Sequence, residues 1–514
     1  ICFFFGGGCA IILQIYAKTE RGRRGVQNRL EKLFWGGFAL LWGWIVLNSV
    51  FRWEHNGPAA FAVGAALAAG VWALSKWVLP RLNGLSPKRW RALFCTAFAL
   101  YAAAFAVMAW LLAEVPIMDQ EVVLRTLSDL LDDGRFGVWS GYYIVCNNNL
   151  GLALVLGGWY WLAGLVGFEP DSTLMGVAPG IALNVLALLF SVALLCLLAR
   201  RVLKTNAAVA LVFALCAAFA PFWLYSPCFY SDTLSMPFGL LALLAFETWQ
   251  REERRARRLL LAAGAGAAVF FGYAVKGSVA VIAVALAIQF FLRAKPRRAL
   301  AALAAMAMTL GLLAGGYRLW QRAWLIDWTE EEALGLPIQL WFCYGSHDDG
   351  NYSQADYEAA MTVDTIAERK ELLNARIAAN YASYSPLELA EFMTRKAAIT
   401  WGDGLYNAEE FLATPQRANW THTFILEGQP GYMPLVYYCQ AYLYMMQLLV
   451  LACAVRAVRR PAAGPVMLAG VSVTGLILFL SLWETKARYA FNFTPLLLLL
   501  AAAALMPPAA EEKA

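Results

Sequence analysis

The stretch Pro116–Asn149, PIMDQEVVLRTLSDLLDDGRFGVWSGYYIVCNNN, is polar and lies between two long apolar segments. Before it, Ala92–Ala113 is long enough to cross a bilayer, and after it the chain becomes apolar again at Leu150. Apolar residues recur within the stretch at helical spacing, which predicts an amphipathic helix along the membrane surface. Asp119 stands where the chain leaves the bilayer. A carboxylate at this boundary is placed to meet a substrate carried by a lipid.

The composition indicates a polytopic membrane protein. Of the 514 residues, 61% are hydrophobic and only 15% are charged, more apolar than a soluble domain requires. The formal charge of +6 is small, and the arginines cluster in short loops, a pattern of membrane topology rather than of nucleic-acid binding. The ten cysteines lie far apart and show no zinc or disulfide-scaffold spacing.

Basic loops are expected on the cytoplasmic side, and this rule gives a consistent topology. Lys18–Lys32, Arg81–Arg91 and Arg251–Arg258 are then inside, which puts the stretch around Asp119 outside. The loop after Leu150–Val166, at Phe168–Thr173, carries only acidic charges, whereas the next helix ends in basic residues. We therefore expect Leu150–Val166 to lie at the outer leaflet without crossing. The chain begins ICFFFGGG without Met, and we interpret its first residues as the remnant of a longer helix rather than a signal peptide.

The topology gives about thirteen transmembrane helices and a small external domain. The external segment, residues 318–431, is too long for a loop without structure and shows helical periodicity. It is therefore expected to be mainly helical. The expected parts are N-terminal transmembrane helices (1–91), a transmembrane core (92–317) with its first external loop at 114–149, an extracytoplasmic domain (318–431) and C-terminal transmembrane helices (432–514).

Lys276 interrupts a long apolar run, Leu259–Leu292, that has basic residues on both flanks. At about 1.5 Å per residue the run is too long for one crossing and just long enough for two short helices. A lysine at the middle of the bilayer would cost roughly 3 kcal/mol or more, whereas at the boundary it costs little. The sequence therefore predicts a helical hairpin with Lys276 at its outer bend, near Arg488.

Topology alone collects five ionisable residues at helix ends on the outer face. A carboxylate there can deprotonate or orient a hydroxyl, and a cation can hold a phosphate leaving group. A single charge at a helix end can also be a simple interfacial anchor, and Asn147–Asn149 fits a helix cap as well as a substrate contact. His347 and His422 are too isolated to indicate a metal site. The five residues are Asp119, Asp232, Lys276, Glu484 and Arg488.

Taken together, the motifs around these residues resemble the bacterial GT-C glycosyltransferases, the superfamily of the protein O-mannosyltransferases and the aminoarabinose transferase of lipid A. Several match a Gram-positive branch. The resemblance spans roughly Ala92 to Leu505. Its motifs are PIMDQ, CNNNLGL, YSPCFYSDTLSMPFGLLAL, AVKGS, PIQLWFCYGSHDDGNYSQADYE and WETKARYAFNFTPLLLLL.

The resemblance implies an all-α GT-C fold and an inverting transfer of one sugar from a polyprenyl-phosphate donor. The acceptor would be a cell-envelope polymer, a lipid or a protein at the outer face of a bacterial plasma membrane. No nucleotide sugar, cofactor, metal or nucleic acid is expected. The implied roles are catalysis for Asp119 and Asp232, phosphate binding for Lys276 and Arg488, and support or substrate contact for Asn148, Asn149, Tyr230 and Glu484.

The sequence departs from the family pattern at two positions. Cys146 stands where the pattern has Pro, and Leu340 stands where it commonly has His before Trp341. These departures bear on donor or acceptor preference rather than on the reaction.

Two alternatives remain open from the sequence. A transporter or flippase of lipid-linked sugars would line a path through the membrane with its ionisable residues. A non-catalytic scaffold for envelope assembly would need no convergence of these residues. An enzyme would need Asp119, Lys276 and Arg488 around one site open to the outer leaflet.

Overall fold

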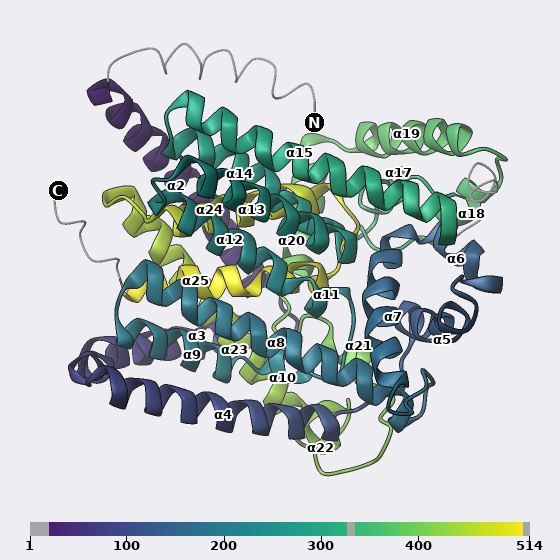
Figure 1. The fold of residues 1–514 in the computed structure, drawn as a ribbon, viewed down its shortest axis with the longest axis horizontal. Helices are drawn as coiled ribbons and strands as arrows, with labels where there is room; N and C mark the ends of the chain where they lie inside the picture. The colour runs from purple at the N-terminus through teal and green to yellow at the C-terminus, as the bar shows by residue number, and fades with distance from the viewer. Residues whose placement is uncertain (1–19, 326–334, 507–514) are drawn as a thin grey trace.

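The computed structural model describes residues 20–325 and 335–506, and the regular elements of these residues are helices (Figure 1). Nine stretches of the described chain are long and apolar enough to cross a membrane, so the expected all-α, polytopic architecture is confirmed. Their helices are α2 (Glu20–Arg52), α3 (Gly57–Ala73), α4 (Pro87–Leu111), α8 (Leu174–Leu203), α13 (Arg255–Val275), α15 (Pro296–Trp320), α23 (Tyr432–Arg459), α24 (Gly464–Leu482) and α25 (Thr494–Leu505).

The other described α-helices have 18 residues or fewer, and several of them connect the long ones. They are α5 (Met118–Asp133), α6 (Ser140–Val145), α7 (Leu150–Gly164), α9 (Asn206–Ala218), α10 (Ala220–Leu224), α11 (Ser231–Leu234), α12 (Met236–Arg251), α14 (Ala280–Arg293), α17 (Gln339–Tyr344), α18 (Gln354–Met361), α19 (Ile366–Ser383), α20 (Pro386–Trp401), α21 (Ala408–Phe411) and α22 (His422–Ile425).

The expected count of about thirteen crossings is not confirmed. Three helices counted as crossings, α9, α12 and α14, have 13, 16 and 14 residues. At about 1.5 Å per residue they are shorter than a typical hydrocarbon core of about 30 Å. The first expected crossing, in residues 1–17, lies outside the described residues. α7 has 15 residues, which fits the expectation that this segment does not cross.

The predicted hairpin at Lys276 is present. α13 ends at Val275, Lys276 itself is extended (φ −148°, ψ 116°), and a 3₁₀ turn at Gly277–Val279 leads into α14. The helix therefore breaks at the one lysine of the apolar run, as the cost of burying that charge in lipid requires.

The segment expected to be external is helical in its described part. The helices expected near Thr362–Ala378 and Pro386–Ile399 form α19 and α20, and each begins with a capping box, in which a Ser or Thr side chain and a Glu satisfy the first free N–H groups. Helix α15 passes the expected boundary at residue 318 and continues as a helical turn to Leu325. The division into domains stays a prediction.

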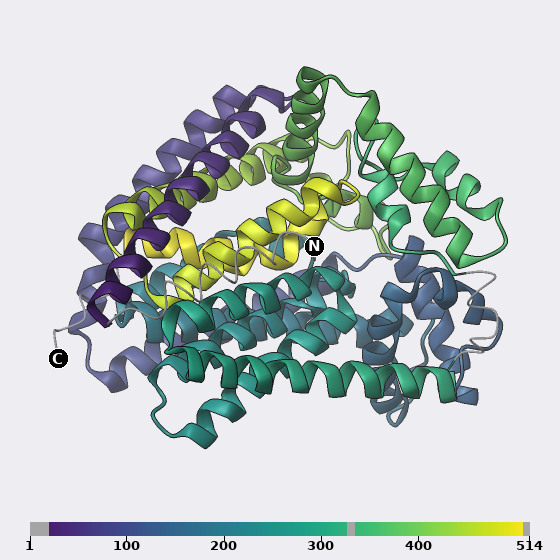
Figure 2. The ribbon, with the colours of Figure 1, turned by 90° about the horizontal axis from the view of Figure 1, so that it is seen from above.

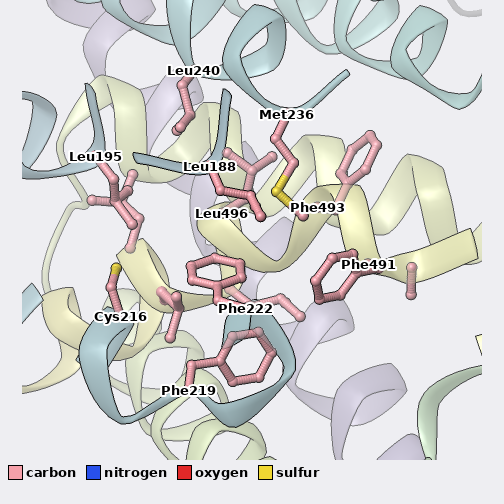
Figure 3. Close-up of a cluster of buried hydrophobic side chains, with 14 of the residues drawn as sticks. Leu188, Leu195, Cys216, Phe219, Phe222, Met236, Leu240, Phe491, Phe493 and Leu496 are labelled. Carbon is pink, nitrogen blue, oxygen red and sulfur yellow. The ribbon is translucent and has the colours of Figure 1, made fainter. Parts of the chain in front are cut away.

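The C-terminal helix lies in the centre of the molecule. Of the apolar window in Ala487–Leu505, 83% is buried, against 17% for Pro87–Leu111 at the periphery. In Figure 2 the yellow C-terminal helices lie between the purple N-terminal and the teal central helices. Figure 3 shows Phe491 and Phe493 packed with side chains of α8, α10 and α12. This packing fixes the 3₁₀ helix Ala487–Phe493, which carries Arg488.

The elements that carry the expected external residues gather at one end of the molecule. In Figure 1, α5, α6, α18 and α19 lie at the right, and the long helix α15 ends on the same side. Short helices from distant parts of the sequence thus gather at one end of the molecule.

We predict that position 387 in α20 is accessible from outside the cell and position 257 only from the cytoplasm. Leu387 is 80% exposed and the Arg257 side chain 62% exposed, so a cysteine at either position can react. In a cysteine-free background, a membrane-impermeant maleimide should label L387C in intact cells and R257C only after permeabilisation. The reverse pattern would contradict the charge-based topology.

Candidate functional site

Two cations share one buried carboxylate at the centre of the site. Asp232 in α11 is fully buried, and its Oδ1 is paired with Lys276 Nζ. Its Oδ2 lies 3.7 Å from Arg488 Nη1. The side chains of Lys276 and Arg488 are 11% and 15% exposed, so both cations keep some access to the exterior, whereas Asp232 has none. These three ion-paired residues together carry one positive charge in excess.

The backbone around each charge is held by local interactions. Arg488 N–H donates to Asn407 Oδ1 at 3.2 Å, which joins the 3₁₀ helix to the segment before α21. Asn407 has φ 58°, a left-handed conformation that Asn tolerates better than most residues. Thr233 Oγ1 donates to the carbonyls of Cys228 and Tyr230, closing the turn that presents Asp232.

A second polar cluster is formed by residues that follow the three charged residues in the sequence. Asn492 Nδ2 donates to Ser235 Oγ at 3.3 Å and to Ser278 Oγ at 3.1 Å. These three residues follow Arg488, Asp232 and Lys276 by four, three and two positions. Asn492 therefore ties together the three elements that carry the charges.

Asp119 belongs to the same contact network. It is half-buried, in the first turn of α5, and its two carboxylate oxygens accept from Tyr142 OH at 2.9 Å and Tyr230 OH at 3.1 Å. The Tyr230 ring centroid lies 5.4 Å from the guanidinium carbon of Arg488, within range of a cation–π interaction. Tyr230 thus connects Asp119 with the cluster around Asp232. A cavity shared by the two acids stays a prediction.

The side chain of Asn149 bonds to this network and not to the N-terminus of α7. It occupies the N-cap position of α7 but makes no side-chain cap there. Its Nδ2 donates to Tyr142 OH at 2.7 Å, and its Oδ1 accepts from Tyr230 OH at 3.2 Å and from the exposed Asn148 at 3.3 Å. The interpretation of Asn147–Asn149 as a helix cap is therefore wrong for Asn149.

Glu484 lies at the other side of the cluster. It is 6% exposed and accepts a hydrogen bond from Tyr489 OH at 2.8 Å. Burial raises the pKa of Glu484, and the hydrogen bond from Tyr489 partly opposes that rise. Lys276 Nζ lies 5.3 Å from the centroid of the same tyrosine ring. Tyr489 therefore lies between Glu484 and the cations.

Helices α17 and α20 are fastened to the loop that carries Glu484. The buried Lys396 of α20 donates to the carbonyls of Gly345 and Trp483. Trp341 stacks on Trp483 with centroids 5.9 Å apart and an interplanar angle of 5°. The segment between α15 and α23 is thus held against the site.

The two histidines of this segment have separate polar partners. Both ring nitrogens of His347 contact carboxylates, Nδ1 that of Asp348 at 2.7 Å and Nε2 that of Asp356 at 2.6 Å. His422 Nδ1 accepts from Asn419 N–H at 2.8 Å. Among the described residues no three His, Cys, Asp or Glu side chains gather in a geometry that could hold a metal ion.

All eight residues expected at the site are thus linked, directly or through one neighbour. Sequence reasoning missed Tyr142, Tyr489 and Asn492. Tyr489 directly follows Arg488, so the ArgTyr pair carried a signal. Tyr142 carried none, because its contact with Asp119 depends on how the chain turns back after α6.

The sequence of this chain matches a known protein family. Residues 90–508 match the family described as conserved hypothetical integral membrane protein. The chain belongs to this family. No curated protein matches it.

Two solved structures are similar at low identity. One is the archaeal oligosaccharyltransferase AglB of Archaeoglobus fulgidus, in complex with an inhibitory peptide and a dolichol-phosphate, at 14% identity and a TM-score of 0.44. The similarity covers 79% of this chain and 50% of that protein, so the chain spans about half its length. The other is ArnT of Cupriavidus metallidurans, bound to undecaprenyl phosphate, at 12% identity and a TM-score of 0.30, covering 82% of this chain and 78% of that one.

We predict that a methyl group at Gly151 disturbs the site and that one at Gly158 does not. A Cβ at Gly151 in α7 would overlap the backbone carbonyl of Ala274, two residues before Lys276. Gly158, on the same helix, has nothing within 4 Å of such a Cβ. Gly151→Ala should therefore destabilise the protein by about 1–3 kcal/mol, as overpacking does.

Gly158→Ala should be neutral or stabilise by up to about 1 kcal/mol, because Ala favours the helix. Thermal unfolding in detergent, followed by tryptophan fluorescence, measures both. Equal midpoints for wild-type and Gly151→Ala would show that α7 does not pack tightly against the Lys276 bend.

Proposed function

We propose that this protein is a GT-C-type membrane glycosyltransferase that moves one sugar, with inversion, from a polyprenyl-phosphate carrier to an acceptor. The observation that carries the proposal is the pair of cations over the buried Asp232, linked through Tyr230 to the half-buried Asp119. A phosphate site and a base are the two parts that such a transfer needs. The motifs that resemble the GT-C glycosyltransferases fall on these same residues.

The cation pair suits a phosphate that gains charge during the reaction. A sugar-linked polyprenyl phosphate is a diester with one negative charge, and its departure from the sugar leaves a second charge on the phosphate. Lys276 and Arg488 carry one positive charge more than Asp232, the carboxylate ion-paired with them, which favours a phosphate at this pair. Charge-assisted bonds from a site with little water strengthen as the leaving group forms.

Asp119 is the proposed base. The proton of the acceptor hydroxyl moves to its carboxylate while the hydroxyl oxygen forms a bond to the anomeric carbon. The bond from that carbon to the phosphate oxygen breaks, and its electron pair remains on the phosphate. A single displacement of this kind inverts the anomeric centre.

We propose for Asp232 a structural role instead of the catalytic role that the motifs imply. Its carboxylate is fully buried and paired with both cations, so in this structure an acceptor has no access to it. We therefore assign it to anchoring Lys276 and Arg488. Glu484, Asn148, Asn149 and Tyr230 are supporting residues around the same site.

The setting follows the charge-based topology. The site would face the outside of a bacterial plasma membrane, and the acceptor would be an envelope polymer, a lipid or a protein. The reaction as written uses no metal, because the two cations supply the positive charge. The convergence of Asp119, Lys276 and Arg488 in one network supports an enzyme rather than a scaffold or a flippase.

We predict that Asp119→Asn and Lys276→Ala fail in different ways. Asp119→Asn keeps size and hydrogen bonding but removes basicity, so transfer should fall about 10²–10⁴-fold with donor binding largely intact. Lys276→Ala removes one charge-assisted contact and should weaken donor binding. The measurements are turnover with a purified polyprenyl-phosphate sugar in detergent and, separately, affinity for that donor.

Lys370→Ala is the matched control, because this exposed lysine of α19 lies outside the network and should change neither quantity. Near wild-type turnover in Asp119→Asn would rule out the base role. Unchanged donor affinity in Lys276→Ala would rule out the phosphate site.

A further inference from the structure

We propose that Tyr142 is a positioning residue that holds Asp119 in one orientation through a closed ring of hydrogen bonds. The inference rests on the proposed function, in which Asp119 takes the acceptor proton. The ring passes from Asn149 to Tyr142, Asp119 and Tyr230 and back to Asn149, with distances of 2.7, 2.9, 3.1 and 3.2 Å.

The hydrogens of the ring fix its direction at Tyr142. The amide nitrogen of Asn149 only donates, so the Tyr142 oxygen accepts there. The single phenolic proton of Tyr142 is then free for Asp119 Oδ1. The orientation of the Asn149 amide is set by its oxygen, which accepts from Asn148 Nδ2 at 3.3 Å. The single phenolic proton of Tyr230 is shared between Asn149 Oδ1 and Asp119 Oδ2. Tyr142 therefore donates to Asp119 Oδ1 and fixes the direction of that oxygen.

Burial gives the ring its rigidity. Asn149 and Tyr230 are 1% and 4% exposed, whereas Asp119 is half-buried and keeps an open side. A carboxylate held at both oxygens by fixed donors has one direction left in which to meet an acceptor hydroxyl. Orientation within about half an ångström is what a general base requires of its surroundings.

The backbone on both sides is bent to bring the ring together. Cys146 (φ −109°, ψ 53°) interrupts the helical path after α6, so that Asn149 returns to Tyr142 seven residues earlier. Met118, next to Asp119, has φ 52°, an uncommon conformation for a residue that is not glycine. Such conformations persist where the surrounding contacts enforce them.

Further titratable groups of the described chain interact electrostatically with Asp119. They include Glu484, which is a carboxylate, and Arg488 is the cation on the far side of Tyr230. None of these groups donates to Asp119 Oδ1 in place of Tyr142. The groups are Tyr143 in α6, Cys146 just after it, Tyr230 before α11 and Glu484 after α24.

The test compares Tyr142→Phe with Tyr143→Phe. Tyr143 is the adjacent residue of the same helix, fully buried, and its hydroxyl pairs with Thr126 rather than Asp119. Each variant removes one phenolic hydroxyl and keeps the ring. The measurement is the pH dependence of kcat/KM for transfer from a purified polyprenyl-phosphate sugar, with Asp119→Asn assayed alongside.

Tyr142→Phe should move the acidic limb of the profile to higher pH, because the charged carboxylate loses a phenol donor. Its plateau should fall about tenfold or less, compared with the 10²–10⁴-fold loss expected for Asp119→Asn. Tyr143→Phe should leave the acidic limb in place.

An unchanged limb in Tyr142→Phe, with Asp119→Asn inactive, would overturn the positioning role and leave the proposed function intact. Equal shifts in both tyrosine variants would also overturn it, because the effect would then not depend on contact with Asp119. An active Asp119→Asn would instead overturn the proposed function.

Discussion

The pairing of one buried carboxylate with two cations is the interaction on which the site depends. A carboxylate with no exposed surface is stable as an anion only with charged partners, and Asp232 has Lys276 and Arg488. The two cations in turn are largely removed from solvent and need Asp232. Removing Asp232 would leave both cations without this ion-pair partner, whereas removing one cation would leave a single ion pair with Asp232. This requirement brings together α11, the bend between α13 and α14, and the 3₁₀ helix before α25.

Smaller interactions convert this charge pairing into a defined geometry. Asn492 bridges Ser235 and Ser278, and the aromatic packing around Phe491 holds the 3₁₀ helix in the core (Figure 3). Tyr230 carries the connection outward to Asp119 through its hydroxyl and its ring. The orientation of Asp119 thus depends on the charge pairing, and the charge pairing depends on the packing of the core.

The features predicted correctly from the sequence are those that depend on the energy of placing a single residue in the membrane or at its boundary. A lysine inside an apolar run must lie at a boundary, so the break at Lys276 followed, and charge bias put Asp119 and Arg488 at one face. The number of crossings is not confirmed, because helices such as α12 are apolar but short. Contacts that depend on how distant segments meet, such as Tyr142 with Asp119 or Asn149 with two tyrosines, had no periodicity from which to be predicted.

The central claim is that Lys276 and Arg488 form the binding site of a lipid-borne phosphate. The most direct measurement is an experimental structure of the protein in a lipid nanodisc with a polyprenyl phosphate bound. The account predicts phosphate oxygens at about 3 Å from Lys276 Nζ and from the guanidinium of Arg488, with Asp232 still beneath them. A phosphate bound elsewhere, with the ion pairs of Asp232 undisturbed and closed to the ligand, would contradict it.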